Sequence, residues 1–148
     1  MNYKLLCAVV FGLIAFSALG QDEALTQRLN GDLLKRFPET SEVTVEWRQM
    51  PYGNMAFYTV NNQPKMSLYK GDGKFSKSYT QESWQTRVPE NVKMEFDNSP
   101  YYSFSVITFW ESDASDYKTY FLEMQDKEGV SKEAWFDENG KFSATPFR

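Results

Sequence analysis

A four-residue sequence, Gly-Lys-Phe-Ser, occurs twice in this chain, at Gly73–Ser76 and again at Gly140–Ser143. Each copy follows a short acidic stretch that is typical of a tight turn, KGD in the first case and DEN in the second. Asp, Asn and Gly favour turn geometry, and Gly can adopt the positive φ that a hairpin turn needs. A turn and strand written twice indicates that one structural unit is encoded twice, which restricts the possible folds strongly.

A second pair of matches lies upstream of these turns. Val43 aligns with Val106, and Trp47 aligns with Trp110, at a slightly shorter offset. The change in offset is explained if the second copy has a longer hairpin loop, and the acidic segment 111–116 is such a loop. Because the matches frame the repeat and the length change falls in a loop, the pattern predicts an internal duplication.

Residues 1–20 are predicted to be a signal peptide. Lys4 gives the positive start, an almost unbroken apolar run follows, and Ala18 and Gly20 are small residues suited to cleavage before Gln21. The apolar run is short for a membrane-spanning helix, and no second run follows it. We therefore expect a periplasmic or secreted protein whose mature chain has no membrane span; a retained anchor helix is the alternative.

Composition argues against several classes of function. The chain carries 20 Asp and Glu against 16 Lys and Arg, which disfavours nucleic acid or an anionic membrane surface as the partner. It has no histidine, and its one cysteine, Cys7, lies in the predicted signal peptide. Disulfides, thiolate nucleophiles, imidazole bases and the usual zinc sites are therefore not expected in the mature chain. We expect no enzymatic activity, no cofactor and no metal site.

Each copy is predicted to open with a helix. In the first copy, residues 21–80, an apolar stripe recurs at the spacing of one helix face: Leu25, Leu29 and Leu33. In the second copy, residues 81–148, a shorter helix is predicted to follow Pro89, which suits a first helical turn, and to place Val92 and Phe96 on one face. Each helix gives its unit one apolar surface to bury.

Four strand-like runs follow each helix and are separated by turn-forming residues. Short connections between neighbouring strands predict antiparallel hairpins, because parallel pairing requires long crossovers. The predicted fold is α+β, with two units of one helix and a four-stranded meander that together form one domain. A single helix can cover only one face of its sheet, which leaves the other face for water or for a partner.

The strands of the second copy carry apolar side chains on both faces. In one strand Val106 and Trp110 are predicted to share the core face, while Phe109 points to the other. Trp135 and the phenylalanine after it must also point to opposite faces. Two interpretations follow. Either the second face is covered, by the other copy or by residues 77–90, or it is an exposed aromatic surface that binds a partner.

Taken together, the FPE…VxVxW opening, the second strand rich in Tyr and Phe, and the acidic hairpin ending in GKF, in tandem behind a signal peptide, resemble the PepSY-like, β-lactamase-inhibitor-like (BLIP-like) exported proteins of bacteria. The resemblance covers essentially the whole mature chain. It implies that the sheets of the two units join into one curved antiparallel sheet with helices on one face. It also implies an aromatic concave face that grips an enzyme, although no inhibitory residue can be matched.

The predicted function is that of a non-enzymatic binding protein of the cell envelope, which grips a protein or peptide with its helix-free face. Whether the grip inhibits the partner stays open at this point. The predicted contact residues are aromatic: Tyr52, Tyr58, Tyr69, Phe109, Phe121 and Trp135. The alternative is a small-ligand or cation-binding protein that uses the cleft between the units. A weak cation site at Glu111–Asp116 belongs to this alternative. The DEN and KGD stretches are expected to be turns, because no late bidentate Glu follows them.

Overall fold

The structure is a computed structural model and describes residues 23–147. The predicted signal peptide and its cleavage site lie outside the described residues. Within residues 23–147, no helix combines the length and the apolar character needed to cross a membrane.

The first half of the described chain contains a helix, a short 3-10 helix and four strands. These are α1 (Glu23–Arg36), η1 (Pro38–Glu42), β1 (Glu46–Met50), β2 (Gly53–Val60), β3 (Gln63–Lys70) and β4 (Phe75–Glu82). The second half repeats this order with two short helices before its strands. These are α2 (Trp84–Arg87), α3 (Glu90–Asn98), β5 (Ser105–Ser112), β6 (Thr119–Gln125), β7 (Ser131–Asp137) and β8 (Phe142–Ser143).

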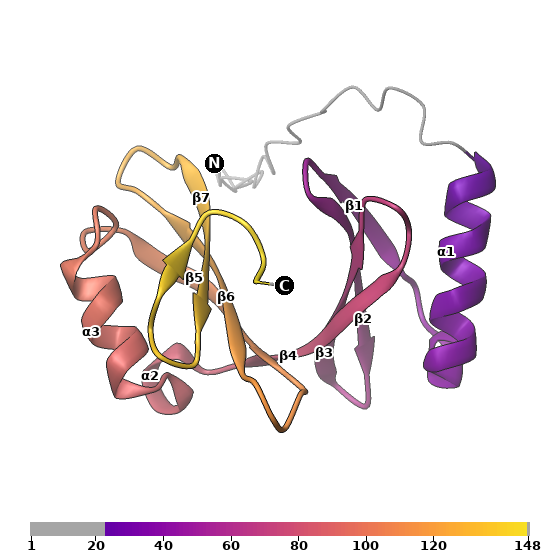
Figure 1. The fold of residues 1–148 in the computed structure, drawn as a ribbon, viewed down its shortest axis with the longest axis horizontal. Helices are drawn as coiled ribbons and strands as arrows, with labels where there is room; N and C mark the ends of the chain where they lie inside the picture. Colours follow the sequence, from indigo (N-terminus) through magenta and orange to yellow (C-terminus); the bar gives the residue numbers. More distant parts are fainter. Residues whose placement is uncertain (1–22, 148) are drawn as a thin grey trace, which may run out of the picture.

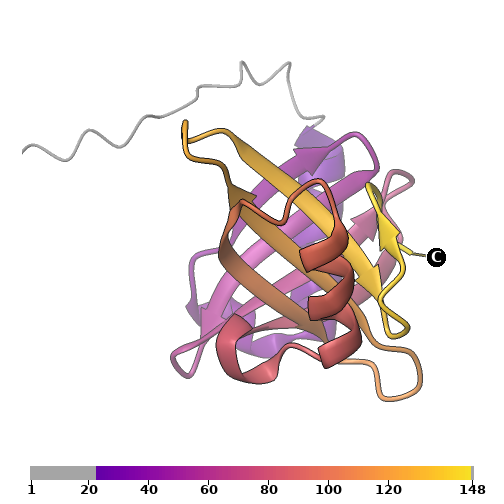
Figure 2. The same ribbon diagram turned by 90° about the vertical axis from the view of Figure 1, so that its left-hand side faces the viewer.

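All eight strands form one antiparallel sheet in chain order, from β1 to β8. Figure 1 shows that the sheet is strongly curled, so that its first and second halves face each other across a concave side. Helix α1 lies outside the first half, and Figure 2 shows α2 and α3 outside the second. The predicted α+β class and the antiparallel pairing are confirmed. That the two halves are copies of one unit, divided at residue 80, stays a prediction.

The helices form where the apolar patterns predicted them. Leu29 and Leu33 are the buried residues of α1, and the helix ends before Pro38, whose ring disfavours helical geometry in the residue preceding it. Pro89 stands immediately before α3, and that helix buries Val92 and Phe96. Each helix therefore covers the outer face of its half of the sheet with one apolar stripe.

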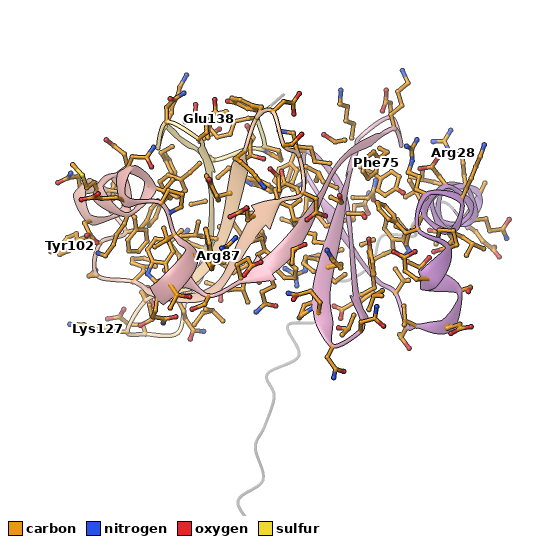
Figure 3. All side chains as sticks on the ribbon, turned by 90° about the horizontal axis from the view of Figure 1, so that it is seen from below. Arg28, Phe75, Arg87, Tyr102, Lys127 and Glu138 are labelled. Carbon is orange, nitrogen blue, oxygen red and sulfur yellow. The ribbon has the colours of Figure 1, made fainter. Side chains whose placement is uncertain are left out.

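The two GKF turns hold the helices in place. Gly73 and Gly140 have φ values of 80° and 82°, which confirms that both segments are hairpin turns. Arg28 of α1 donates to a carbonyl of the first turn (3.1 Å), and Asn91 of α3 donates to the carbonyl of Glu138 in the second turn (2.6 Å). Figure 3 shows Arg28 at α1 and Glu138 over the opposite half. Each turn thus docks on the helix of its own half.

Buried apolar side chains form three clusters. One lies under α1, and a second lies under α2 and α3. The third fills the concave side between the two halves, and we call it the concave core: Met55, Met66, Leu68, Tyr79, Trp110, Phe121 and Trp135. Because its members come from β2, β3 and β4 on one side and from β5, β6 and β7 on the other, the concave core joins the halves.

A β-bulge in β5 changes which side chains face the helices. The register shifts between Val106 and Thr108, so Ile107 is an extra residue without a partner on β6. An extra residue breaks the strict alternation of side chains along a strand. As a result Val106 packs under α3, whereas Trp110 joins the concave core. The prediction that these two residues share one face is wrong.

Candidate binding cleft

The predicted contact residues do not form one exposed face. Tyr58 and Tyr69 lie under α1, and Phe109 lies under α2 and α3. The other three belong to the concave side: Tyr52, Phe121 and Trp135. Tyr52 is partly buried, and none of the remaining five is more than 6% exposed. The prediction of an exposed surface made of these rings is wrong. The helices cover three of the rings, and the two halves of the sheet fold over the other three. The alternative, in which the halves pack together, agrees with the structure.

The rings of the concave core interleave across the two halves. Trp135 of β7 stacks on Phe121 of β6 with ring centroids 4.4 Å apart. From the other half, Tyr79 and Tyr52 meet the same indole ring edge-on, at 5.8 Å and 6.0 Å. Aromatic pairs of this kind contribute about 0.5–1.5 kcal/mol each beyond the area that they bury. Trp135 is therefore the centre of the contact between the halves.

A cluster of four polar side chains lies beside the concave core. The guanidinium of Arg48 on β1 lies 2.6 Å from a carboxylate oxygen of Glu123 on β6 and 3.9 Å from one of Glu133 on β7. The hydroxyl of Tyr52 donates to Glu133 (3.1 Å). We call these four side chains the Arg48 bridge. Glu123 and Glu133 are direct partners across β6 and β7, and like charges in such positions repel unless a cation lies between them.

The surroundings of the Arg48 bridge shift two of its proton equilibria. Burial raises the pKa of Glu133 above its usual value, while the hydrogen bond from Tyr52 opposes that effect. Burial and the neighbouring carboxylate of Glu133 raise the pKa of Tyr52 as well. Tyr52 therefore stays a neutral hydrogen-bond donor at any physiological pH. The Arg48 bridge places charged side chains at the cleft, and its contacts connect β1 to β6 and β7.

The Arg48 bridge was not predicted from the sequence. The acidic partners of Arg48 lie far from it along the chain, so no local spacing pattern links them. The available signal was weak: Glu123 interrupts the apolar run of β6 between Leu122 and Met124. A carboxylate in such a strand requires a cation nearby, but the sequence does not say which one.

Replacing Arg48 with glutamine is expected to lower the free energy of unfolding by about 1–2 kcal/mol near neutral pH, because Glu123 and Glu133 then face each other without a cation. The folded state already binds the Glu133 proton more tightly than the unfolded state does. The free energy of unfolding therefore falls as pH rises and Glu133 loses its proton. This fall should be steeper in Arg48→Gln, which has no cation beside the carboxylate. The difference in stability between the variant and the wild type should therefore be smaller at about pH 5 than near neutral pH.

Urea unfolding of both chains at the two pH values measures this difference. Arg87→Gln is the matched control, because Arg87 pairs with Glu82 at 3.8 Å on the surface and its side chain is 56% exposed. We expect that control to change stability by less than about 0.5 kcal/mol. An equal effect of the two substitutions would contradict a role of Arg48 in joining the halves.

The concave side is open at two places. One is a groove of about 540 Å³ that we call the β2 groove, and its lining includes Val43, Glu46, Phe57, Thr59, Lys65 and Trp110. Phe57 and Trp110 pair edge-on inside it, with ring centroids 5.7 Å apart. The groove therefore reaches the margin of the concave core and exposes part of an aromatic pair between charged rims.

The other opening is partly filled by the chain itself. After β8 the chain turns toward the concave side, and Figure 1 shows its end between the two halves. Phe147 packs against the concave core. A cavity of about 470 Å³ remains beside this segment, with a lining that includes Tyr52, Leu68, Gly71, Ser76, Pro146 and Phe147. We call residues 144–147 the terminal segment.

The acidic loop after β5 is engaged in contacts with the protein. Glu111 forms an ion pair with Lys118 (2.8 Å), and Asp113 accepts a hydrogen bond from Thr80 (2.6 Å). Throughout residues 23–147, no group of three or more His, Cys, Asp or Glu side chains is arranged to hold a metal ion. The structure thus offers nothing in favour of the cation site proposed for Glu111–Asp116.

Comparison with known proteins supports the fold. No family model matches the sequence, and no curated protein matches it either. A crystal structure of a DUF2874 family protein from Bacteroides uniformis superposes with a TM-score of 0.51 and 16% identity, over 77% of this chain and 83% of that one. A proposed periplasmic protein from Bacteroides eggerthii superposes with a TM-score of 0.51 and 14% identity, over 77% of this chain and 82% of that one. The chain shares the fold of these two proteins.

A third solved structure is a BLIP-like protein from Bacteroides fragilis. It matches with a TM-score of 0.44 and 17% identity, over 79% of this chain and 82% of that chain. A score below 0.5 does not establish a common fold. The resemblance to PepSY-like and BLIP-like proteins therefore stays a prediction.

Proposed function

We propose that this chain is an exported, non-enzymatic binding protein that holds an extended segment of a protein or peptide partner in the cleft between the two halves of its sheet. The observation that carries the proposal is the β2 groove, which is lined by the partly buried ring of Phe57 with the buried Trp110 beside it. An aromatic floor accepts apolar side chains of a partner, and a polar rim gives its backbone hydrogen-bonding groups.

The chemistry of the rim agrees with a peptide partner. Glu46 and Lys65 place charges of both signs beside the groove, next to the hydroxyl groups of Thr44 and Thr59. This mixture suits the alternating donors and acceptors of an extended backbone. The acidic net charge of −4 disfavours nucleic acid. The predicted signal peptide and a structural neighbour described as a proposed periplasmic protein support a place in the periplasm or outside the cell.

The proposal is tested by blocking the groove without disturbing the core. Thr59 is exposed and lines the β2 groove, so Thr59→Arg places a long side chain in it. Displayed peptides are selected on the wild-type chain, and the dissociation constant of the best binder is measured by calorimetry. We expect Thr59→Arg to weaken binding by about tenfold or more, which corresponds to one blocked anchor contact.

Thr86→Arg is the matched control, because Thr86 is exposed on α2, on the helix-covered side of the sheet. It should leave binding unchanged. Equal affinities of the wild type and Thr59→Arg would place the binding site elsewhere and overturn the proposal, as would a selection that yields no binder. If only small apolar molecules bind, and Thr59→Arg blocks them, the alternative of a small-ligand protein replaces the peptide proposal.

A further inference from the structure

We infer that the terminal segment, residues 144–147, is an internal ligand of the cleft, and that the natural occupant of its place is an extended peptide that presents a proline followed by an aromatic residue. This inference goes beyond the proposed function, because it concerns the second opening of the concave side and not the β2 groove. It names both the chemistry of the occupant and the means by which access is limited. The four residues concerned are Ala-Thr-Pro-Phe. Figure 1 shows the chain after β8 running between the two halves of the sheet, and Phe147 packs there against the concave core.

The terminal segment is attached to the cleft by packing and not by a hydrogen-bond ladder. Strand β8 ends at Ser143 after two residues. The backbone N–H of Thr145 then donates to the Ser143 hydroxyl (3.2 Å), which is a local contact. In the part of the chain that the structure describes, no hydrogen bond joins residues 144–147 to another strand. Phe147, packed against the concave core, is what fixes the segment there.

A contact of this kind is suited to exchange. Removing the segment from its place breaks no strand pairing, so the sheet can stay intact while Phe147 leaves. The residues exposed by that movement are apolar side chains of the first half, among them Tyr52 and Leu68. Because exposed apolar surface is unfavourable in water, the freed place requires a new apolar occupant. The cavity of about 470 Å³ already open beside the segment gives such an occupant a point of entry.

The composition of the terminal segment shows which chemistry fits. Proline has no backbone N–H, so Pro146, which lines the cavity and is partly buried, leaves no donor unpaired there. Phe147 supplies the ring that packs on the concave core. A partner with the same two residues reproduces both features. A charged side chain in place of Phe147 would lose its hydration against the apolar residues of the concave core.

The test uses the hexapeptide SATPFR as the probe and a chain shortened to end at Ser143 as the receptor. We expect the shortened chain to bind the probe, and the full chain to bind it about tenfold more weakly or worse, because a tethered competitor acts at a high effective concentration. The variant peptide SATPAR should not bind. In nuclear magnetic resonance spectra, the Trp135 indole N–H signal, assigned with Trp135→Phe, should shift when the probe binds.

A second variant covers the possibility that the shortened chain does not fold. Full-length Phe147→Ala keeps the backbone of the segment but removes the ring, and it should bind the probe more tightly than the wild type does. The inference is overturned if neither folded variant binds SATPFR, or if the wild type binds it equally well. Failure here is separable from failure of the proposed function, because Thr59→Arg blocks the β2 groove and should leave binding of SATPFR to the shortened chain unchanged.

Discussion

Truncating Trp135 to alanine is expected to lower the free energy of unfolding by about 3–5 kcal/mol, the usual loss for a large aromatic side chain in a packed core. Trp135 is fully buried and is in contact with rings from both halves of the sheet. Its removal therefore leaves a cavity at the place where the halves meet. Urea unfolding followed by far-ultraviolet circular dichroism measures the loss, because the transition reports the whole sheet.

The matched control is Trp47→Ala. Trp47 lies on the edge strand β1, is only partly buried, and packs on the α1 side of the sheet. We expect a smaller loss there, about 1–2 kcal/mol, since part of the ring is already in water. If Trp135→Ala cost no more than Trp47→Ala, the concave core would not be what joins the two halves.

Replacing Gly53 with alanine is expected to lower the free energy of unfolding by about 2–3 kcal/mol, through a backbone clash. Gly53 begins β2 and is the partner of Lys70 on β3. A Cβ atom at this position would overlap the carbonyl oxygen of Tyr69. That oxygen belongs to a paired strand and cannot move aside as a flexible side chain would. Thermal unfolding followed by circular dichroism gives the change.

Gly31→Ala supplies a control of opposite sign. Gly31 is exposed within α1, and a Cβ atom there would meet nothing within 4 Å apart from its neighbours and the backbone of its own helix. Alanine favours a helix over glycine by about 1 kcal/mol, so this variant should be more stable than the wild type. If Gly31→Ala lowered the free energy of unfolding as much as Gly53→Ala does, the loss at Gly53 would have a cause other than the close approach of β3.

The sequence predicted the local structure well, because local structure depends on neighbours along the chain. The stripe at Leu29 and Leu33 defined α1, and Gly73 and Gly140 marked the two docked turns. The antiparallel order of the strands followed from the short loops between them. Each of these features is set by residues a few positions apart, and the amino-acid pattern is enough to specify them.

The faces of the sheet could not be predicted in the same way. The bulge at Ile107 inserts one residue into β5, and nothing in the amino-acid pattern distinguishes that residue from its neighbours. Trp110 consequently moved from the expected helix side to the concave side. The curling of the sheet, which buries Phe121 and Trp135, depends on contacts between distant strands. Aromatic residues on a strand indicate that something covers them, but they do not indicate whether the cover is a partner or the same chain.

The Arg48 bridge shows the same limit. Arg48 and its carboxylate partners are separated by most of the chain, and their contact exists only after the sheet has curled. The terminal segment is a further example, since Phe147 comes from one half and lies beside the side chains of the other. Candidate sites formed by residues that are far apart in the sequence can be recognised only in the three-dimensional structure.

The shared concave core also determines what can be expressed on its own. Met55, Met66 and Leu68 of the first half are sheltered by rings of the second. A fragment that ended near residue 80 would expose this apolar surface to water and is expected to aggregate. The first half therefore depends on the second for the burial of its own apolar side chains.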